Sequence, residues 1–350
     1  MALTQGKAPQ FTHEQAVAIA YNLYEISTMA RELPSDRDQN FLLRDTSGGS
    51  LILKIANADE PIETVDSQTK AMEHIALRDP SLGCPRVRAA ISGDMINEVE
   101  DESGVSHFVR LLTFVPGVPL ALIDSHSPAL LWDIGRFFGK LDIALDDFSH
   151  PGTERHLAWD LANASDTVRD HIDCVADPKR RALIRNFLAR FEAETAPRLA
   201  ELPIGVIHND GNDYNVLVDS TDPDSKQVAG IIDFGDMVRT RTVFEPCVAG
   251  AYALLDESDP IAAAAQVAAG YNSVCPLTDL ELELLFNLIC MRLCISVVIA
   301  AYRADRVAHN PYLAISERPA WNALQLLATV KADDALLTFR RQLGGGGGTA

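Results

Sequence analysis

The chain has 350 residues, enough for two lobes with separate cores, and its 47% hydrophobic residues exclude a largely disordered protein. Its formal net charge of −19 argues against a nucleic-acid binder, because an acidic surface repels the phosphate backbone. The same charge would attract a cationic small molecule, although it is equally compatible with a simple contribution to solubility.

The first part of the chain predicts an antiparallel sheet with two helices. Thr12 and Gln15 form a capping-box pattern that marks a helix start. Gln39–Arg44 and Ser50–Ile55 predict the two strands of a hairpin, because the segment between them is rich in turn-forming residues. A second helix is expected at Glu63–Ala76. Three further strands are expected after it, at Pro85–Ile91, Met95–Val99 and Phe108–Thr113.

The stretch Pro116–Pro119 predicts a linker, and helical periodicity dominates beyond it. Helices are expected at Pro128–Leu145, Lys179–Glu201, Pro260–Tyr271, Asp279–Arg303 and Arg318–Arg340. A β-rich island, Val206–Asp219 and Val228–Phe234, interrupts them. The glycine run near the end predicts a disordered tail. We therefore expect an N-terminal lobe at 1–115, a helical C-terminal lobe at 116–342 and a disordered tail at 343–350.

Several features favour a cytoplasmic protein. The N-terminal residues lack a basic segment followed by an apolar run, so we expect no signal peptide. The most apolar segment, Leu284–Ala301, is interrupted by Asn287 and Arg292, which favours a core helix over a membrane span. The six cysteines form no C-x-x-C pair and predict free thiols in a reducing compartment. The oligomeric state cannot be derived from the sequence.

The pattern H-x-D-x-x-x-x-N lies in the island, between two apolar segments. Phosphoryl transfer needs a carboxylate beside the acceptor hydroxyl and a neutral oxygen ligand for Mg²⁺. Asp210 suits the first role and Asn215 the second, while His208 is expected to brace the loop by hydrogen bonding. The alternative is an ordinary polar turn.

A second pattern, Asp233-Phe234-Gly235-Asp236, ends the next apolar strand. Mg²⁺ binds carboxylate oxygens beside substrate phosphates, so Asp233 is expected to join the metal to the outer phosphates of a nucleotide. Asp236 either assists or only caps the next segment. The pattern is weak alone and gains weight because it follows the H-x-D loop by one short hairpin.

A third signal is Lys54, a charged residue in the apolar strand Leu51–Ile55. Because a buried lysine is costly unless paired, Lys54 is expected to contact nucleotide phosphates and an acid of the following helix. The alternative is an edge-strand lysine that points to solvent. The helix offers three candidate partners that do not share one face, which are Glu63, Gln68 and Glu73.

These motifs, in this order, resemble the aminoglycoside phosphotransferase-like superfamily, also called the phosphotransferase enzyme family, which includes aminoglycoside, choline, homoserine and hydroxylysine kinases. The resemblance implies an α+β, bilobal, protein-kinase-like fold with a small antiparallel-sheet N-terminal lobe and a larger, mainly helical C-terminal lobe. It implies ATP or GTP as donor with Mg²⁺. Arg110–Gly117 resembles the family's hinge, where the backbone around Leu112 and Phe114 would bind the purine edge. Asn40 would lie in the segment that covers the phosphates.

Four stretches most resemble the hydroxylysine kinase branch, namely Ser35–Phe41, Asp210–Asn215, Phe234–Met237 and Asn310–Glu317. This implies transfer to the hydroxyl of a small, cationic, hydroxylated amino acid or amino alcohol. An aminoglycoside or other antibiotic kinase and a homoserine- or choline-type kinase remain alternatives. A nucleotide-binding pseudokinase scaffold is the non-enzymatic alternative. The presence of Lys54, Asp210, Asn215 and Asp233 argues against it.

The sequence also departs from the family pattern. The family's helix acid falls on Gln68, which can orient Lys54 through a hydrogen bond but adds no charge. There is no G-x-G-x-x-G loop, and no A-P-E segment follows Asp233, which argues against a protein kinase.

The substrate side leaves two questions open. Acidic residues of the helical lobe either face a substrate ammonium group or are solvated surface charges; they are Glu245, Asp256, Glu257 and Asp259. Three aromatic residues either wall a substrate pocket or pack in the core; they are Trp159, Tyr252 and Trp321.

Overall fold

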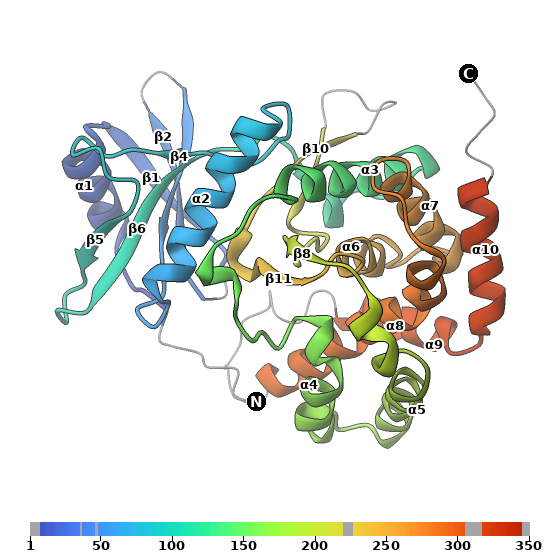
Figure 1. Ribbon diagram of the computed structural model, residues 1–350. Helices are drawn as coiled ribbons and strands as arrows, with labels where there is room; N and C mark the ends of the chain where they lie inside the picture. The colour runs from blue at the N-terminus through green and yellow to red at the C-terminus, as the bar shows by residue number, and fades with distance from the viewer. Residues whose placement is uncertain (1–7, 36, 46–47, 220–226, 305–316, 345–350) are drawn as a thin grey trace. The chain divides into compact units, whose positions relative to one another are not determined.

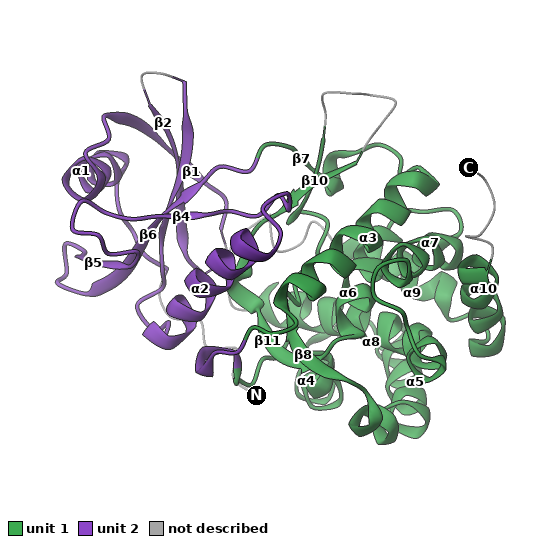
Figure 2. Cartoon of the chain, turned by 45° about the horizontal axis from the view of Figure 1, so that its top comes forward, with its two compact units in different colours: residues 1, 116–148, 154–350 green, residues 2–115, 149–153 purple. Residues whose placement is uncertain are grey.

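The computed structural model describes residues 8–35, 37–45, 48–219, 227–304 and 317–344 (Figure 1). The chain forms two compact units (Figure 2). The first unit in chain order comprises residues 2–115 with 149–153 and is purple in Figure 2 (unit 2 in its key), and the second comprises residues 116–148 with 154–350 and is green (unit 1 in its key). Of the expected tail 343–350, residues 343 and 344 belong to the last described helix, and residues 345–350 lie outside the described residues. The stretch Asn310–Ser316 and part of the expected turn before Ser50–Ile55 also lie outside them.

The first unit contains a six-stranded antiparallel sheet and two helices. Its elements are α1 (His13–Tyr24), β1 (Thr28–Leu33), β2 (Gln39–Asp45), β3 (Ser50–Ile55), α2 (Ile62–Arg78), β4 (Val87–Arg88), β5 (Asn97–Glu100) and β6 (Ser106–Thr113). The strand order is β1-β2-β3-β6-β4, and β5 also pairs with β6. The α+β character expected for this part is confirmed.

Strand alternation divides this sheet into two chemically different faces. One face packs with α1 in a core cluster that includes Phe41, Leu53 and Leu111 from β2, β3 and β6. The helix start is fixed as expected, because the Thr12 side chain accepts a hydrogen bond from Gln15 N. The other face carries the neighbouring residues of the same strands, and Lys54 is one of them.

The second unit is mainly helical. Its helices are α3 (Pro128–Leu145), α4 (Ala164–His171), α5 (Pro178–Glu194), α6 (Phe244–Ala253), α7 (Pro260–Asn272), α8 (Asp279–Ala304), α9 (Glu317–Leu327) and α10 (Ala332–Gly344). Its strands are β7 (Val118–Pro119), β8 (Ile204–Ile207), β9 (Val216–Val218), β10 (Val228–Ile231) and β11 (Val238–Arg241). They form two antiparallel sheets, β10-β9-β7 and β11-β8.

Two glycines allow α3 and α7 to pack side by side (Figure 1). A Cβ on Gly135 would lie 1.8 Å from Val267 O, and a Cβ on Gly270 would lie 1.8 Å from Trp132 O. No side chain fits at these distances, so the close approach of the two backbones requires glycine at both positions.

Helix α8 is long and apolar enough to cross a membrane, and no other described helix is. In its most apolar window, 89% of the residues are buried within the structure, which is the burial of a core helix. The interruptions expected to mark a core helix, Asn287 and Arg292, are themselves buried. A buried charge in such a helix needs a partner, which is described below.

Several elements differ from the sequence-based expectation. The expected helix Arg318–Arg340 is two helices, because α9 ends where Thr329 Oγ1 donates to Leu326 O at 2.7 Å. The expected linker contains β7, which pairs with β9. Besides β7, the strands β1 and β11 and the helices α4 and α6 were not predicted.

Candidate active site

The β9–β10 hairpin brings Asn215 and Asp233 to one end of a small sheet. Asn215 directly precedes β9, and Asp233 comes two residues after the last residue of β10. The strands are antiparallel, with Val216 opposite Ile231, and Ile232 N donates to Asn215 O at 3.1 Å. The start of one strand and the end of its antiparallel neighbour meet at one edge, so the pairing places both residues there.

The loop between His208 and Asn215 is held by Glu245, a fully buried residue of α6. Glu245 Oε2 accepts hydrogen bonds from His208 N at 2.5 Å and from Asn209 N at 3.2 Å. Asn209 has φ 65°, a left-handed conformation that asparagine tolerates better than most residues, and its Nδ2 donates to Asp236 O at 3.3 Å. One buried carboxylate thus fixes the backbone turn immediately before Asp210.

His208 is fully buried and supports the same loop. Its Nδ1 accepts a hydrogen bond from Asp210 N at 3.3 Å, and its ring stands edge-on to Phe234 with 4.7 Å between centroids. Burial lowers the pKa of His208 to about 4, so the ring is neutral at pH 7. The ring therefore orders the Asp210 loop without exposing an atom to a substrate.

Asp210 is the partly exposed carboxylate at the centre of this arrangement. Its Oδ1 accepts hydrogen bonds from Asn212 Nδ2 at 3.0 Å and Arg292 Nη2 at 3.3 Å, and its Oδ2 accepts one from Asn215 Nδ2 at 2.7 Å. Burial raises the pKa of Asp210 to about 7; neighbouring carboxylates add to the rise and Arg292 opposes it. A carboxylate with a pKa near neutral is well matched to take a proton from a hydroxyl group.

The residues around Asp210 fit a hard divalent cation. Asn215 Nδ2 is used by Asp210 O and Oδ2, whereas Asn215 Oδ1 accepts no hydrogen bond from any described residue. Asp233 is exposed at the same edge. Within the described ranges, no group of three His, Cys, Asp or Glu residues could hold an ion. A metal here would therefore be completed by phosphate or water oxygens, as Mg²⁺ usually is in nucleotide sites.

In the first unit, Asn40, Lys54 and Arg110 lie opposite one another on β2, β3 and β6. Lys54 Nζ is 2.9 Å from Asp38 Oδ2, an acid that precedes β2 and that the sequence did not single out. Gln68 of α2 instead accepts a hydrogen bond at Oε1 from Arg110 Nη2, at 2.8 Å. The role of Gln68 in orienting Lys54 thus stays a prediction, while Asp38 supplies a charged partner.

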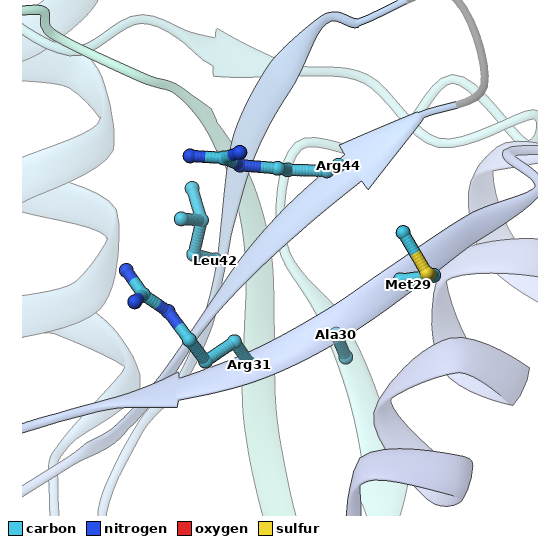
Figure 3. A pocket seen from close by; sticks show the side chains of 5 residues that line it. All are labelled: Met29, Ala30, Arg31, Leu42 and Arg44. Atoms are coloured by element: carbon cyan, nitrogen blue, oxygen red, sulfur yellow. The ribbon is translucent and has the colours of Figure 1, made fainter.

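An apolar row of Leu42, Ile52 and Leu112 runs beside this polar row, two residues further along each strand. A hollow of about 240 Å³ lies next to it and is lined by Met29, Ala30, Arg31, Leu42 and Arg44 (Figure 3). Both arginines and the leucine of this set project from the same face. Apolar surface and positive charge on one face suit the base and the phosphates of a nucleotide.

The expected hinge residues follow this face. Leu112 is buried in β6, and Phe114, just after the strand, leaves 42% of its side chain exposed. Binding of a purine edge by the backbone of Leu112 and Phe114 stays a prediction, as does a phosphate contact of Asn40, whose Nδ2 donates to Ser35 Oγ at 3.3 Å.

Arg292 is a further site residue whose role the sequence analysis missed. Its side chain is 1% exposed, and its guanidinium lies 4.8 Å from the centroid of the Trp159 ring and 5.5 Å from that of Tyr252. The available signal in the sequence was a charged residue inside an otherwise apolar helix, because a buried charged side chain needs a partner. Trp321, by contrast, is a buried residue with Arg180 over its ring at 4.7 Å.

Three of the four acidic residues singled out in the second unit have structural partners. Glu245 is fully buried behind the loop from His208 to Asn215, which contradicts both alternatives considered for it, a contact with a substrate ammonium group and a solvated surface charge. Glu257 Oε1 lies 3.1 Å from His126 Nδ1, and Asp259 Oδ1 accepts a hydrogen bond from Ala262 N at the start of α7. The sequence could not separate these roles, because they depend on tertiary contacts.

Comparison with known proteins identifies the family. Residues 30–281 match the model described as the Phosphotransferase enzyme family. The chain belongs to this family. A hydroxylysine kinase of Mus musculus is 31% identical over 341 residues, which cover 91% of this chain and 90% of the mouse protein. Membership makes the chain a phosphotransferase with an alcohol group as acceptor, as the sequence predicted.

Two solved structures share the fold. A microcompartment-associated aminopropanol kinase superposes with a TM-score of 0.69 at 20% identity, covering 91% of this chain and 97% of the other. An amicoumacin kinase in complex with AMP-PNP, Ca²⁺ and Ami gives a TM-score of 0.68 at 12% identity, covering 93% of this chain and 97% of the other. The expected protein-kinase-like fold is confirmed.

Proposed function

We propose that the protein transfers the terminal phosphoryl group of ATP or GTP to the hydroxyl of a hydroxylated amino acid or amino alcohol of the hydroxylysine type. The observation that carries this proposal is the environment of Asp210, a partly exposed carboxylate with a pKa of about 7 that is hydrogen-bonded to Asn215. Similarity to hydroxylysine kinases over most of the chain supports this choice of acceptor.

In this proposal Asp210 accepts the proton of the acceptor hydroxyl as the oxygen attacks the terminal phosphorus, and the bond from that phosphorus to its bridging oxygen breaks to release ADP or GDP. Asn215, through Oδ1, and Asp233 hold Mg²⁺. When bound there, Mg²⁺ neutralises charge on the transferring phosphoryl group. His208 and Glu245 keep the backbone of the loop in place, which preserves the distance between Asp210 and the acceptor.

The first unit is proposed to bind the donor. Lys54, paired with Asp38, contacts the phosphates, and Asn40 lies beside Lys54 on the neighbouring strand. The purine edge binds the backbone at Leu112 and Phe114. The positive charge of this face supports the assignment, because the rest of the chain is strongly acidic.

The acceptor is proposed to be cationic as well as hydroxylated, since the net charge of −19 favours a positively charged ligand.

We also propose a reducing, cytoplasmic location, which is supported by six free cysteines, four of them buried.

A thermal-shift panel tests the proposal. Hydroxyamino acids, amino alcohols and aminoglycosides are each added with Mg²⁺ and either ATP or GTP, because a ligand that binds the native state raises its melting temperature by mass action. Hydroxylysine is expected to raise the melting temperature above the value with nucleotide alone. A rise with aminoglycosides and none with hydroxyamino acids or amino alcohols would contradict the proposed acceptor.

A further inference from the structure

Arg292 links α8 to the catalytic loop as a buried cation. Its Nη1 donates to Trp159 O at 2.6 Å while its Nη2 lies 3.3 Å from Asp210 Oδ1. The rings of Trp159 and Tyr252 lie beside the guanidinium, and the side chain is 1% exposed. A buried guanidinium held by two aromatic rings and a carbonyl has little freedom to move, so it presents Nη2 to Asp210 from a fixed direction.

The hydrogen bonds of Asp210 identify which of its oxygens remains open. A carboxylate offers about four lone-pair sites, two on each oxygen. Asn212 and Arg292 donate to Oδ1, which fills both sites of that atom. Asn215 donates to Oδ2 and leaves its second site unused by the described residues. The acceptor hydroxyl therefore has one place to bind, on Oδ2.

We propose that Arg292 is a positioning residue for the transfer reaction: it occupies Oδ1 of Asp210, fixes the rotation of the carboxylate and leaves Oδ2 as the atom that receives the hydroxyl proton. The proposal rests on the proposed function, because it assigns Asp210 as the proton acceptor. Arg292 acts through Asp210 and has no contact with substrate.

Arginine suits this position better than lysine. Its planar guanidinium group donates hydrogen bonds in two fixed directions at once, here to Trp159 O and to Asp210 Oδ1. A lysine would keep the positive charge, but its side chain is shorter and its ammonium group cannot donate in the same two fixed directions. The carboxylate would then rotate between orientations, and fewer bound acceptors would lie in line for attack.

A double-mutant experiment tests the assignment. Arg292→Met is made in the wild type and in Asp210→Asn, and kcat and the KM for nucleotide are measured for each. In the wild type, Arg292→Met is expected to lower kcat by about 10²-fold and leave the nucleotide KM unchanged, since misplacement of a reacting group costs about that much. In the Asp210→Asn background it is expected to add almost nothing, because the group it positions is gone.

A control on the same helix separates positioning from general damage to the core. Asn287 is also buried in α8, where its Nδ2 donates to Glu194 Oε2 and Thr195 Oγ1. Asn287→Leu is expected to change the melting temperature but not kcat. Arg292→Lys, which retains the charge, is expected to give a kcat between those of the wild type and Arg292→Met, and it replaces Arg292→Met if that variant does not fold.

Two results would overturn the proposal. One is an equal loss of kcat on replacing Arg292 in both backgrounds, which would mean that Arg292 acts independently of Asp210. The other is a crystal structure of Arg292→Met in which the Asp210 carboxylate keeps its orientation and its bonds to Asn212 and Asn215. That structure decides the assignment even if the wild type phosphorylates none of the tested acceptors, a result that would instead defeat the proposed function.

Discussion

Replacement of Glu245 is the sharpest test of how the catalytic loop is held. Glu245 Oε2 accepts two backbone hydrogen bonds, from His208 N and Asn209 N, and the side chain is fully buried. Glu245→Ala leaves both N–H groups without an acceptor. Each unsatisfied buried donor costs about 1–3 kcal/mol, so the free energy of unfolding should fall by about 2–6 kcal/mol.

Glu245→Gln gives the matched comparison. Its amide oxygen can accept both bonds, so below pH 7, where the Glu245 carboxyl itself holds a proton, the loss should be limited to about 0.5–1.5 kcal/mol, about the contribution of one neutral hydrogen bond. Glu257→Ala is the control for removal of a glutamate from the same unit, because the partly exposed pair of Glu257 with His126 should contribute no more than about 1 kcal/mol.

The assay is urea unfolding at one pH, followed by kcat for each variant that remains folded. The expected order of destabilisation is Glu245→Ala, then Glu245→Gln, then Glu257→Ala, with kcat falling most in Glu245→Ala because the turn before Asp210 loosens. A Glu245→Ala variant as stable as Glu257→Ala would refute the view that this carboxylate holds the loop.

Three further predictions follow from other contacts. Gly135→Ala should lower the free energy of unfolding by about 1–3 kcal/mol or more, because the added methyl meets the α7 backbone, whereas Gly250→Ala, with 3.7 Å to its nearest neighbour, should be tolerated in the same melting assay. Burial raises the pKa of Glu245 from 4.5 to about 7, so the folded state retains a proton that the unfolded chain has lost between these pH values, and this contribution to stability declines as pH rises. Relative to the wild type, the free energy of unfolding of Glu245→Gln should therefore rise by up to ~1.4 kcal/mol per pH unit between these pH values. Parallel curves of unfolding free energy against pH for the two proteins would contradict this. Asp38→Asn should raise the nucleotide KM about 10-fold, because Lys54 loses a charge-assisted partner at 2.9 Å; an unchanged KM would remove Asp38 from donor binding.

The sequence predicted the parts of the molecule that short-range patterns encode. The hairpin β2–β3, helix α3 and the polar loop containing Asp210 follow from turn residues, apolar periodicity and a fixed motif spacing. Antiparallel pairing of the next two strands then brings Asn215 and Asp233 to one edge, which the motif order had indicated.

The contacts that the sequence did not reveal all join distant segments. Asp38 pairs with Lys54 from just before the neighbouring strand β2, Glu245 holds the loop from a helix that was not predicted, and Arg292 reaches Asp210 across 82 residues. The pattern around each of these residues does not identify which distant residue is its partner. Such pairings are determined by packing of the whole unit, so only the structure identifies them.

Product analysis with hydroxylysine, and with lysine as the matched compound that lacks the hydroxyl, tests the central claim most directly. The purified protein is incubated with Mg²⁺, ATP or GTP and each amino acid, and the products are examined by mass spectrometry. We predict one added phosphoryl group on hydroxylysine, none on lysine, and a loss of at least about 10²-fold in rate with Asp210→Asn. Unmodified hydroxylysine in the presence of a bound nucleotide, or an Asp210→Asn variant as fast as the wild type, would contradict the account.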